Sequence, residues 1–256
     1  MPARTQLGLH LPNWHFRPDD IDRIAALGVR HLVDLHHFRD RWPTVRQRIP
    51  GAIIHGRVDA RGPLDDPVQE ARNFADVIRS VRADTWRYRN EPNIEGVSSW
   101  RDWRDWLVPF GQEIKRLRPN ERIYAPAVSP GTTDWRDWAA ATAEGALQGG
   151  FDGIDAHAYG DPAEVAAVLA VHRTVWPDEW RLLVSEHNFG AGREYDLARY
   201  AADLPRVLDE CTLAGAEACI VFIWEWHQPD VELPTTVDVR NTIVETNWPG
   251  RARYDT

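Results

Sequence analysis

The chain has 256 residues, of which 43% are hydrophobic and 27% are charged, so it is long enough for one globular domain with a sizeable core. Its net charge of −9 and the absence of a basic cluster argue against nucleic acid as a partner. We also expect no membrane span, because no run of about 20 apolar residues occurs. The first residues contain no apolar signal-peptide core, so we expect a cytoplasmic location unless a leader precedes this sequence.

Short apolar runs typical of strands alternate along the chain with amphipathic runs typical of helices. Strands are expected at 7–12, 30–35, 52–58, 84–93, 122–128, 153–159, 182–186 and 218–224. Helices are expected at 18–27, 44–49, 66–81, 99–117, 134–147, 162–175 and 195–213. The eighth helix is weak or missing, because the last segment contains Pro229, Pro234 and Pro249 and allows at best a short helix at 239–245.

This alternation predicts an α/β fold with a parallel sheet and helical crossovers. Eight strands in one domain favour closure into a single, compact (β/α)8 TIM barrel over residues 1–256. An open nucleotide-binding sheet would need a glycine-rich turn after its first strand, and the turn at 12–15 (PNWH) has no glycine.

Two glutamates stand where predicted strands end. Glu91 lies in the NEP motif at 90–92, and Glu186 lies in the SEHN motif at 185–188. A barrel gathers the carboxyl ends of its strands at one mouth, where such enzymes carry their chemistry. Two facing carboxyl groups can cleave a glycosidic bond, with one donating a proton and the other attacking carbon or activating water. The apolar Trp86 and aromatic Tyr88 before Glu91 favour it as the acid, although the residues alone allow the reverse.

These motifs resemble the retaining glycoside hydrolases of the (β/α)8 superfamily called clan A, which includes cellulases, mannanases, xylanases and β-xylosidases. The resemblance covers the predicted strands four to eight, more than half of the chain. It implies that Glu91 is the acid/base and Glu186 the nucleophile. It also implies that Asn90 contacts the 2-hydroxyl of the sugar, that no metal or other cofactor is needed, and that the partner is an oligo- or polysaccharide.

Further positions match the same pattern on neighbouring strands. The HAY motif at 157–159 matches a His-x-Tyr strand end, in which Tyr159 would hold the nucleophile and His157 would lie in the substrate site. Trp224 matches a tryptophan that floors the sugar site. The arginine expected near the nucleophile has no sure match, and Arg57 is the nearest candidate.

The 13 tryptophans suit a carbohydrate partner, since sugar rings stack on flat aromatic faces, but their positions differ in meaning. Trp14, Trp224 and Trp226 follow predicted strands and are candidate sugar platforms. The tryptophans of WRDWRDW at 100–106 recur at helical spacing, which favours a packed helix face. Cys211 and Cys219 lie in apolar segments, and we expect them to be buried free thiols.

Two other functions stay open. A metal-dependent barrel hydrolase or isomerase would use His10, His55 and His157 together with Glu91 or Glu186, although no metal-ligand motif is present. A barrel that binds sugar without cutting it is the other alternative, although both glutamates are retained. The histidines considered as site or ligand residues are His10, His36, His55, His157 and His187. The sequence does not indicate which sugar or linkage is recognised, or whether cleavage is internal or terminal.

Overall fold

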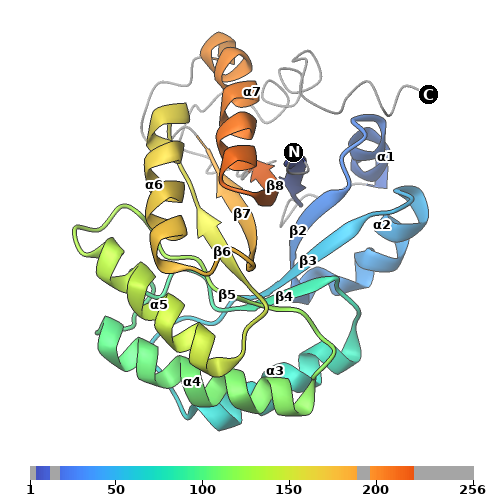
Figure 1. Cartoon of the computed structure of the whole chain (residues 1–256). Helices are drawn as coiled ribbons and strands as arrows, with labels where there is room; N and C mark the ends of the chain where they lie inside the picture. The colour runs from blue at the N-terminus through green and yellow to red at the C-terminus, as the bar shows by residue number, and fades with distance from the viewer. Residues whose placement is uncertain (1–3, 12–17, 189–196, 222–256) are drawn as a thin grey trace, which may run out of the picture.

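The computed structural model describes residues 4–11, 18–188 and 197–221, and its strands form a closed parallel barrel (Figure 1). Each strand is hydrogen-bonded to the next in chain order, and the first is bonded to the last. The strands are β1 (Gln6–His10), β2 (His31–Leu35), β3 (Ile53–Val58), β4 (Thr85–Tyr88), β5 (Ile123–Ala125), β6 (Gly153–His157), β7 (Arg181–His187) and β8 (Ala216–Val221).

Helices connect successive strands and cover the outside of the barrel (Figure 1). They are α1 (Pro18–Ala26), the 3-10 helix η1 (His36–Arg41), α2 (Trp42–Arg48), α3 (Pro67–Ser80), α4 (Trp100–Leu117), α5 (Trp135–Gly149), α6 (Pro162–Val175) and α7 (Leu197–Leu213). The predicted (β/α)8 barrel is therefore confirmed. The segment expected to hold a weak eighth helix, 239–245, lies outside the described residues.

Closure depends on the pairing of β1 with β8. Gln6 pairs with Ala218 and Leu9 pairs with Val221, both in parallel register. The sheet then has no free edge at which a ninth strand could pair. Closure also brings the carboxyl ends of all eight strands to one end of the barrel, which fixes where side chains after β4 and β7 can meet.

Two apolar layers hold the barrel. A small interior cluster comprises Val33, Tyr124, Leu183, Ala218 and Ile220, and a larger core fills the space between the strands and the helices. Gly111 of α4 and Gly149 of α5 allow these helices to approach closely, since a Cβ on Gly111 would lie 2.5 Å from the Gly149 carbonyl oxygen.

The repeated tryptophans of α4 contribute to this core. Trp103 and Trp106 are buried and stack with ring centroids 5.4 Å apart. The indole N–H of Trp103 donates to Thr142 Oγ1 at 2.9 Å, and that of Trp106 donates to the Asp65 carbonyl at 2.8 Å. The expected packed helix face is confirmed at these two residues.

Element bounds differ from expectation mainly where polar contacts redirect the chain. The helix expected at 44–49 begins at Trp42 and follows η1, because the buried Asp34 carboxylate accepts hydrogen bonds from Arg41 and from Trp42 Nε1 (2.7 Å). His36 therefore lies in η1, directly after β2. The strand expected at 122–128 ends at Ala125, and the chain continues to Ser129, whose N–H donates to Asn93 at 2.9 Å.

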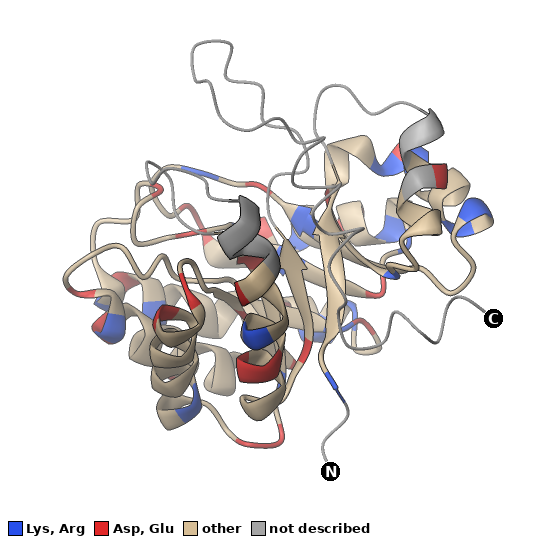
Figure 2. Cartoon of the chain, turned by 90° about the horizontal axis from the view of Figure 1, so that it is seen from above, with Lys and Arg blue, Asp and Glu red and all other residues tan. Residues whose placement is uncertain are grey.

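The cysteines, the charged residues and the helices also agree with expectations from the sequence. Cys211 and Cys219 are buried free thiols, as predicted. Acidic and basic positions are interspersed over the helices (Figure 2). Within the described residues, none of the helices combines the length and apolar character that a membrane span requires.

Candidate active site

The chain leaves β4 through a residue in an unusual backbone conformation. Arg89 has φ of 67°, in the left-handed region that non-glycine residues rarely adopt. Its guanidinium donates to the carbonyls of Gly62 (2.9 Å) and Pro63 (3.1 Å), which secures this conformation against the loop after β3. Asn90 and Glu91 follow at once and are almost fully buried at the carboxyl end of the barrel.

The backbone positions Glu186 differently from Glu91, because Glu186 lies within β7 itself. The register of β6 and β7 shifts between Ala156 and His157, so that His157 pairs directly with Glu186. A register shift of this kind re-aims side chains at a strand end. The preceding Ser185 donates through Oγ to Asp155 at 2.7 Å, which ties the two strands together just below the shift.

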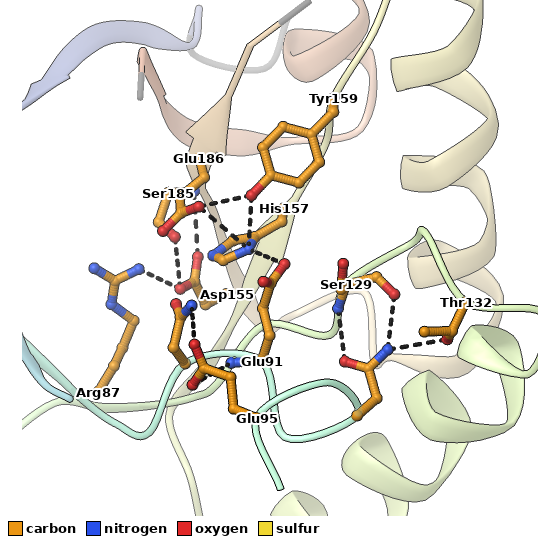
Figure 3. Close-up of polar contacts among 12 residues, drawn as sticks. Arg87, Glu91, Glu95, Ser129, Thr132, Asp155, His157, Tyr159, Ser185 and Glu186 are labelled. Carbon is orange, nitrogen blue, oxygen red and sulfur yellow. Dashed lines mark hydrogen bonds and ion pairs between the residues drawn. The ribbon is translucent and has the colours of Figure 1, made fainter. Parts of the chain in front are cut away.

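The Glu186 carboxylate is buried and accepts two short hydrogen bonds. Arg57 Nη1 donates to Oε1 at 2.5 Å, and the Tyr159 hydroxyl donates to Oε2 at 2.6 Å (Figure 3). Burial raises the pKa of Glu186, but the charges of His157 and Arg57 and the Tyr159 hydrogen bond outweigh it and lower the pKa to about 2. This carboxylate is therefore ionised at neutral pH and suited to act as a nucleophile or a base.

His157 lies between the two carboxylates (Figure 3). Its Nδ1 is 2.7 Å from Glu91 Oε1 and 3.6 Å from Glu186 Oε2. A hydrogen bond therefore joins Nδ1 to Glu91, and the Tyr159 hydroxyl lies 3.2 Å from the same nitrogen. Burial lowers the pKa of His157, but the negative charges of Glu186 and Glu91 outweigh burial and raise it.

The predicted site residues separate into three groups. Six come together at the carboxyl end of the barrel, namely Arg57, Asn90, Glu91, His157, Tyr159 and Glu186. Trp14, Trp224 and Trp226 lie outside the described residues. The third group comprises His10, His36, His55 and His187.

His10, at the end of β1, is close enough for the charges of Arg57 and Glu186 to act on its pKa. Burial, the largest influence, and Arg57 lower that pKa to about 3, so His10 is neutral at pH 7. His55 is part of a different network, since it bonds to His31 at 3.0 Å and to Thr85 Oγ1 at 2.8 Å. His187 bonds to the Ala158 carbonyl at 2.8 Å.

Sequence reasoning missed three charged residues that support the site. Arg87 and Asp155 form a buried ion pair inside the barrel, and Asp155 in turn holds Ser185. Arg87 and Asp155 could have been found from the sequence, because each is a charged residue at an inward position of a largely apolar strand. Glu95, in the loop after β4, accepts from Asn90 Nδ2 at 3.1 Å and from the Glu91 N–H at 3.4 Å. No sequence pattern marks Glu95.

The described residues offer no cluster of three or more histidine, cysteine, aspartate or glutamate side chains arranged to hold a metal ion. The histidines proposed as ligands in the metal alternative are dispersed among different networks. His55 contacts His31 and Thr85, whereas His157 contacts the two glutamates.

No protein-family model matches the sequence, and no curated protein sequence matches it. The structure is nevertheless similar to many solved structures, among which are enzymes that act on carbohydrates. A glucosidase from Croceicoccus marinus superimposes with a TM-score of 0.67 at 14% identity, covering 87% of this chain and 61% of that one. The chain thus spans less than two thirds of the glucosidase.

Two further structures are similar over more of their own length. An endo-β-1,3-glucanase of glycoside hydrolase family 128 (subgroup I) from Amycolatopsis mediterranei, in complex with laminaritriose, gives a TM-score of 0.65 at 15% identity, covering 95% of this chain and 99% of that one. The catalytic domain of a mannanase from Streptomyces sp. SirexAA-E gives 0.60 at 14% identity, covering 88% and 77%. At this level of identity the similarity shows a shared fold: the chain has the TIM-barrel architecture of these glycoside hydrolases.

Proposed function

We propose that this protein is a retaining glycoside hydrolase that cleaves β-glycosidic bonds, with Glu91 as acid/base and Glu186 as nucleophile. The observation that carries the proposal is the pair of buried carboxyl groups at the ends of β4 and β7, both in contact with His157. Their surroundings differ as the two roles require, because only Glu186 is bonded to a guanidinium and a phenol.

The reaction would follow two displacements. In the first, Glu186 attacks the anomeric carbon while Glu91 transfers its proton to the departing oxygen, which leaves a covalent glycosyl–enzyme. In the second, Glu91 takes a proton from water as that water attacks the same carbon, and Glu186 leaves as a carboxylate. Arg57 and Tyr159 hold Glu186 in orientation through both steps.

Both carboxyl groups reach the same nitrogen of His157, which favours the closer spacing of retaining enzymes. Both contacts to His157 share one nitrogen, so Glu91 Oε1 and Glu186 Oε2 are separated by no more than the sum of 2.7 Å and 3.6 Å. Carboxyl groups of inverting enzymes are about 6.5–9.5 Å apart, which leaves room for a water, whereas those of retaining enzymes are about 5–5.5 Å apart.

The substrate we propose is an oligo- or polysaccharide. The similar structures named a glucosidase, an endo-β-1,3-glucanase and a mannanase support this class without choosing among its members. We also propose that residues 1–256 form a single catalytic domain, and that Trp14 and Trp224, both outside the described residues, contact the sugar.

A panel of aryl β-glycosides and β-linked oligosaccharides, followed by proton NMR of the first product formed, tests the proposal. We expect the β-anomer to appear first and to mutarotate later. Initial release of the α-anomer would contradict retention. Addition of EDTA should leave the rate unchanged, and a loss of activity restored by zinc or manganese would instead favour the metal-dependent enzyme. Sugar binding without hydrolysis would favour the non-catalytic barrel.

A further inference from the structure

Glu95 lies one helical turn after Glu91, in the loop between β4 and α4. Its N–H donates to the Glu91 carbonyl at 2.9 Å, while its carboxylate accepts from the Glu91 N–H and from Asn90 Nδ2 (Figure 3). Only 13% of its side chain is exposed. Arg61 Nη2 lies 3.8 Å from the same carboxylate, and burial, the largest influence, raises the pKa of Glu95.

The two neighbours of the Asn90 amide determine which way it points. Arg57 Nη1, which can only donate, lies 2.7 Å from Asn90 Oδ1. Glu95, which when ionised can only accept, lies 3.1 Å from Asn90 Nδ2. A flipped amide would place its NH2 against the guanidinium and its oxygen against the carboxylate, losing both hydrogen bonds and adding two repulsive contacts.

On the Nδ2 side this arrangement leaves Asn90 one hydrogen to donate, while Arg57 uses one of the two lone pairs of Oδ1. Nδ2 has two hydrogens, and Glu95 accepts one of them. The second remains to be donated. We propose that Glu95 is a positioning residue that locks the Asn90 amide as a hydrogen-bond donor to one substrate hydroxyl, whose oxygen must therefore accept. This inference rests on the proposed glycoside hydrolase function and adds the polarity of one sugar contact to it.

The loop is also held by contacts that do not involve the Glu95 side chain, so variants of Glu95 can test the inference. Asn93 bonds in both directions with the Ser129 backbone, accepting from its N–H and donating to its carbonyl, each at 2.9 Å. The Glu95 carbonyl accepts from the Gly62 N–H at 2.8 Å, and this bond survives any side-chain change. We therefore expect Glu95→Gln and Glu95→Ala to fold.

The kinetic test uses an aryl β-glycoside that the wild type cleaves, together with its complete set of monodeoxy analogues. Glu95→Gln should lower kcat/KM about 10- to 100-fold on the parent glycoside, as expected for a misplaced contact close to the reacting centre. One deoxy analogue lacks the hydroxyl that faces Asn90. On this analogue, Glu95→Gln should lower kcat/KM by no more than about 3-fold. In an Asn90→Ala background, Glu95→Gln should likewise cost little, because coupled residues are not additive. Glu144→Gln, an exposed carboxylate paired with Arg104, is the matched control and should be neutral.

A second test measures hydrogen exchange of the Asn90 side-chain amide and does not require enzymatic activity. In 15N-labelled protein, one Asn90 side-chain amide proton, assigned by its disappearance in Asn90→Ala, should exchange slowly in the wild type and rapidly in Glu95→Ala. Equal exchange of both protons in the wild type, or equal kinetic losses on every deoxy analogue, would overturn the proposal. Slow exchange in a protein that cleaves no glycoside would uphold the lock on Asn90 and would reject its role toward a sugar, together with the proposed function.

Discussion

The two strand ends that supply the candidate carboxylates are built in opposite ways. Glu186 lies within β7, paired with His157 of β6 just after a register shift, and is bonded directly to Arg57 and Tyr159. Glu91 lies beyond β4, after the left-handed Arg89, and its carboxylate is bonded to His157. A nucleophile must stay ionised and aimed at one carbon, whereas an acid/base must exchange a proton twice per cycle. The strand end with the guanidinium and the phenol suits the first task and the loop suits the second.

The largest effect should come from removing the Glu186 carboxylate of β7. Glu186→Ala should reduce kcat by at least about 10⁴-fold on every substrate, because no covalent intermediate can form without it. Azide should restore turnover and give the α-glycosyl azide, since it attacks from the face that Glu186 occupied. A β-glycosyl azide would assign the acid/base role to Glu186 and contradict the roles proposed for the two glutamates.

Glu91→Ala should produce a smaller loss that depends on the leaving group. With an alkyl or sugar leaving group, which needs a proton, kcat/KM should fall about 10²- to 10⁴-fold. With 2,4-dinitrophenolate, which leaves without a proton, kcat/KM should fall less than about 10-fold. A series of aryl glycosides of different leaving-group pKa measures this dependence, and an equal loss across the series would contradict the role of Glu91.

Tyr159→Phe tests whether the hydrogen bonds to Glu186 set its pKa. It removes one hydrogen bond that lowers the pKa of Glu186, so this pKa should rise from about 2 toward its ordinary value. Because Glu186 must be ionised to attack, the acidic limb of the kcat/KM profile should move to higher pH. Glu186 stays ionised at pH 7 in both proteins, so the loss of about 10-fold expected there comes from the lost orientation of its carboxylate.

The matched control for Tyr159→Phe is Tyr124→Phe. The Tyr124 hydroxyl donates to Glu217 at 2.7 Å near the start of β8, at the opposite end of the barrel. This variant loses a phenolic hydrogen bond of the same kind, and it should leave the acidic limb unchanged. A shift of equal size in both variants would show that the effect on pH dependence is not specific to the site.

The smallest effect concerns a buried histidine outside the site. Burial lowers the pKa of His172 in α6 to about 4, below its ordinary value of 6.5, so the folded protein holds this ring neutral. The unfolded chain binds a proton there as the pH falls below 6.5, and the stability of the fold therefore decreases between pH 6.5 and 4. His172→Phe should reduce that slope by at most about 1.4 kcal/mol per pH unit.

Urea unfolding at pH 4.5, 5.5 and 6.5 measures the His172 effect, with activity at pH 7 as the check that the site is intact. His172 is informative because neither of its ring nitrogens has a hydrogen-bond partner among the described residues. An unchanged slope would show that the ring is not neutral in the fold, or that other groups dominate acid unfolding.

Much of the fold follows from local sequence pattern. The apolar runs and their regular spacing predicted eight strands, and the structure differs mainly at their ends. The helix at 162–175 was predicted to the residue, because Asp161 caps it and Pro162 begins it. The early end of β5 could not be predicted, because it depends on a contact between Ser129 and Asn93, two loops that the chain brings together only in the barrel.

The site was predictable only in part, because some of its contacts also form only when the barrel brings distant segments together. Glu91 and Glu186 could be paired from their strand ends alone, since a barrel must gather those ends. The separation of His55, bonded to His31, from His157, bonded to Glu91, depends on register and depth in the barrel, which periodicity does not specify. Glu95 could not be found at all, because its side chain acts through a loop conformation set by Arg89 and Gly62.

The central claim is that Glu186 forms a covalent bond to the sugar. Intact-protein mass spectrometry after incubation with activated 2-fluoro β-glycosides tests it most directly, with wild type and Glu186→Ala side by side. We predict that the wild type gains the mass of one 2-fluoroglycosyl group, located to Glu186 by peptide mapping, and that Glu186→Ala gains none. An adduct on another residue, or an adduct of equal yield on Glu186→Ala, would contradict the account.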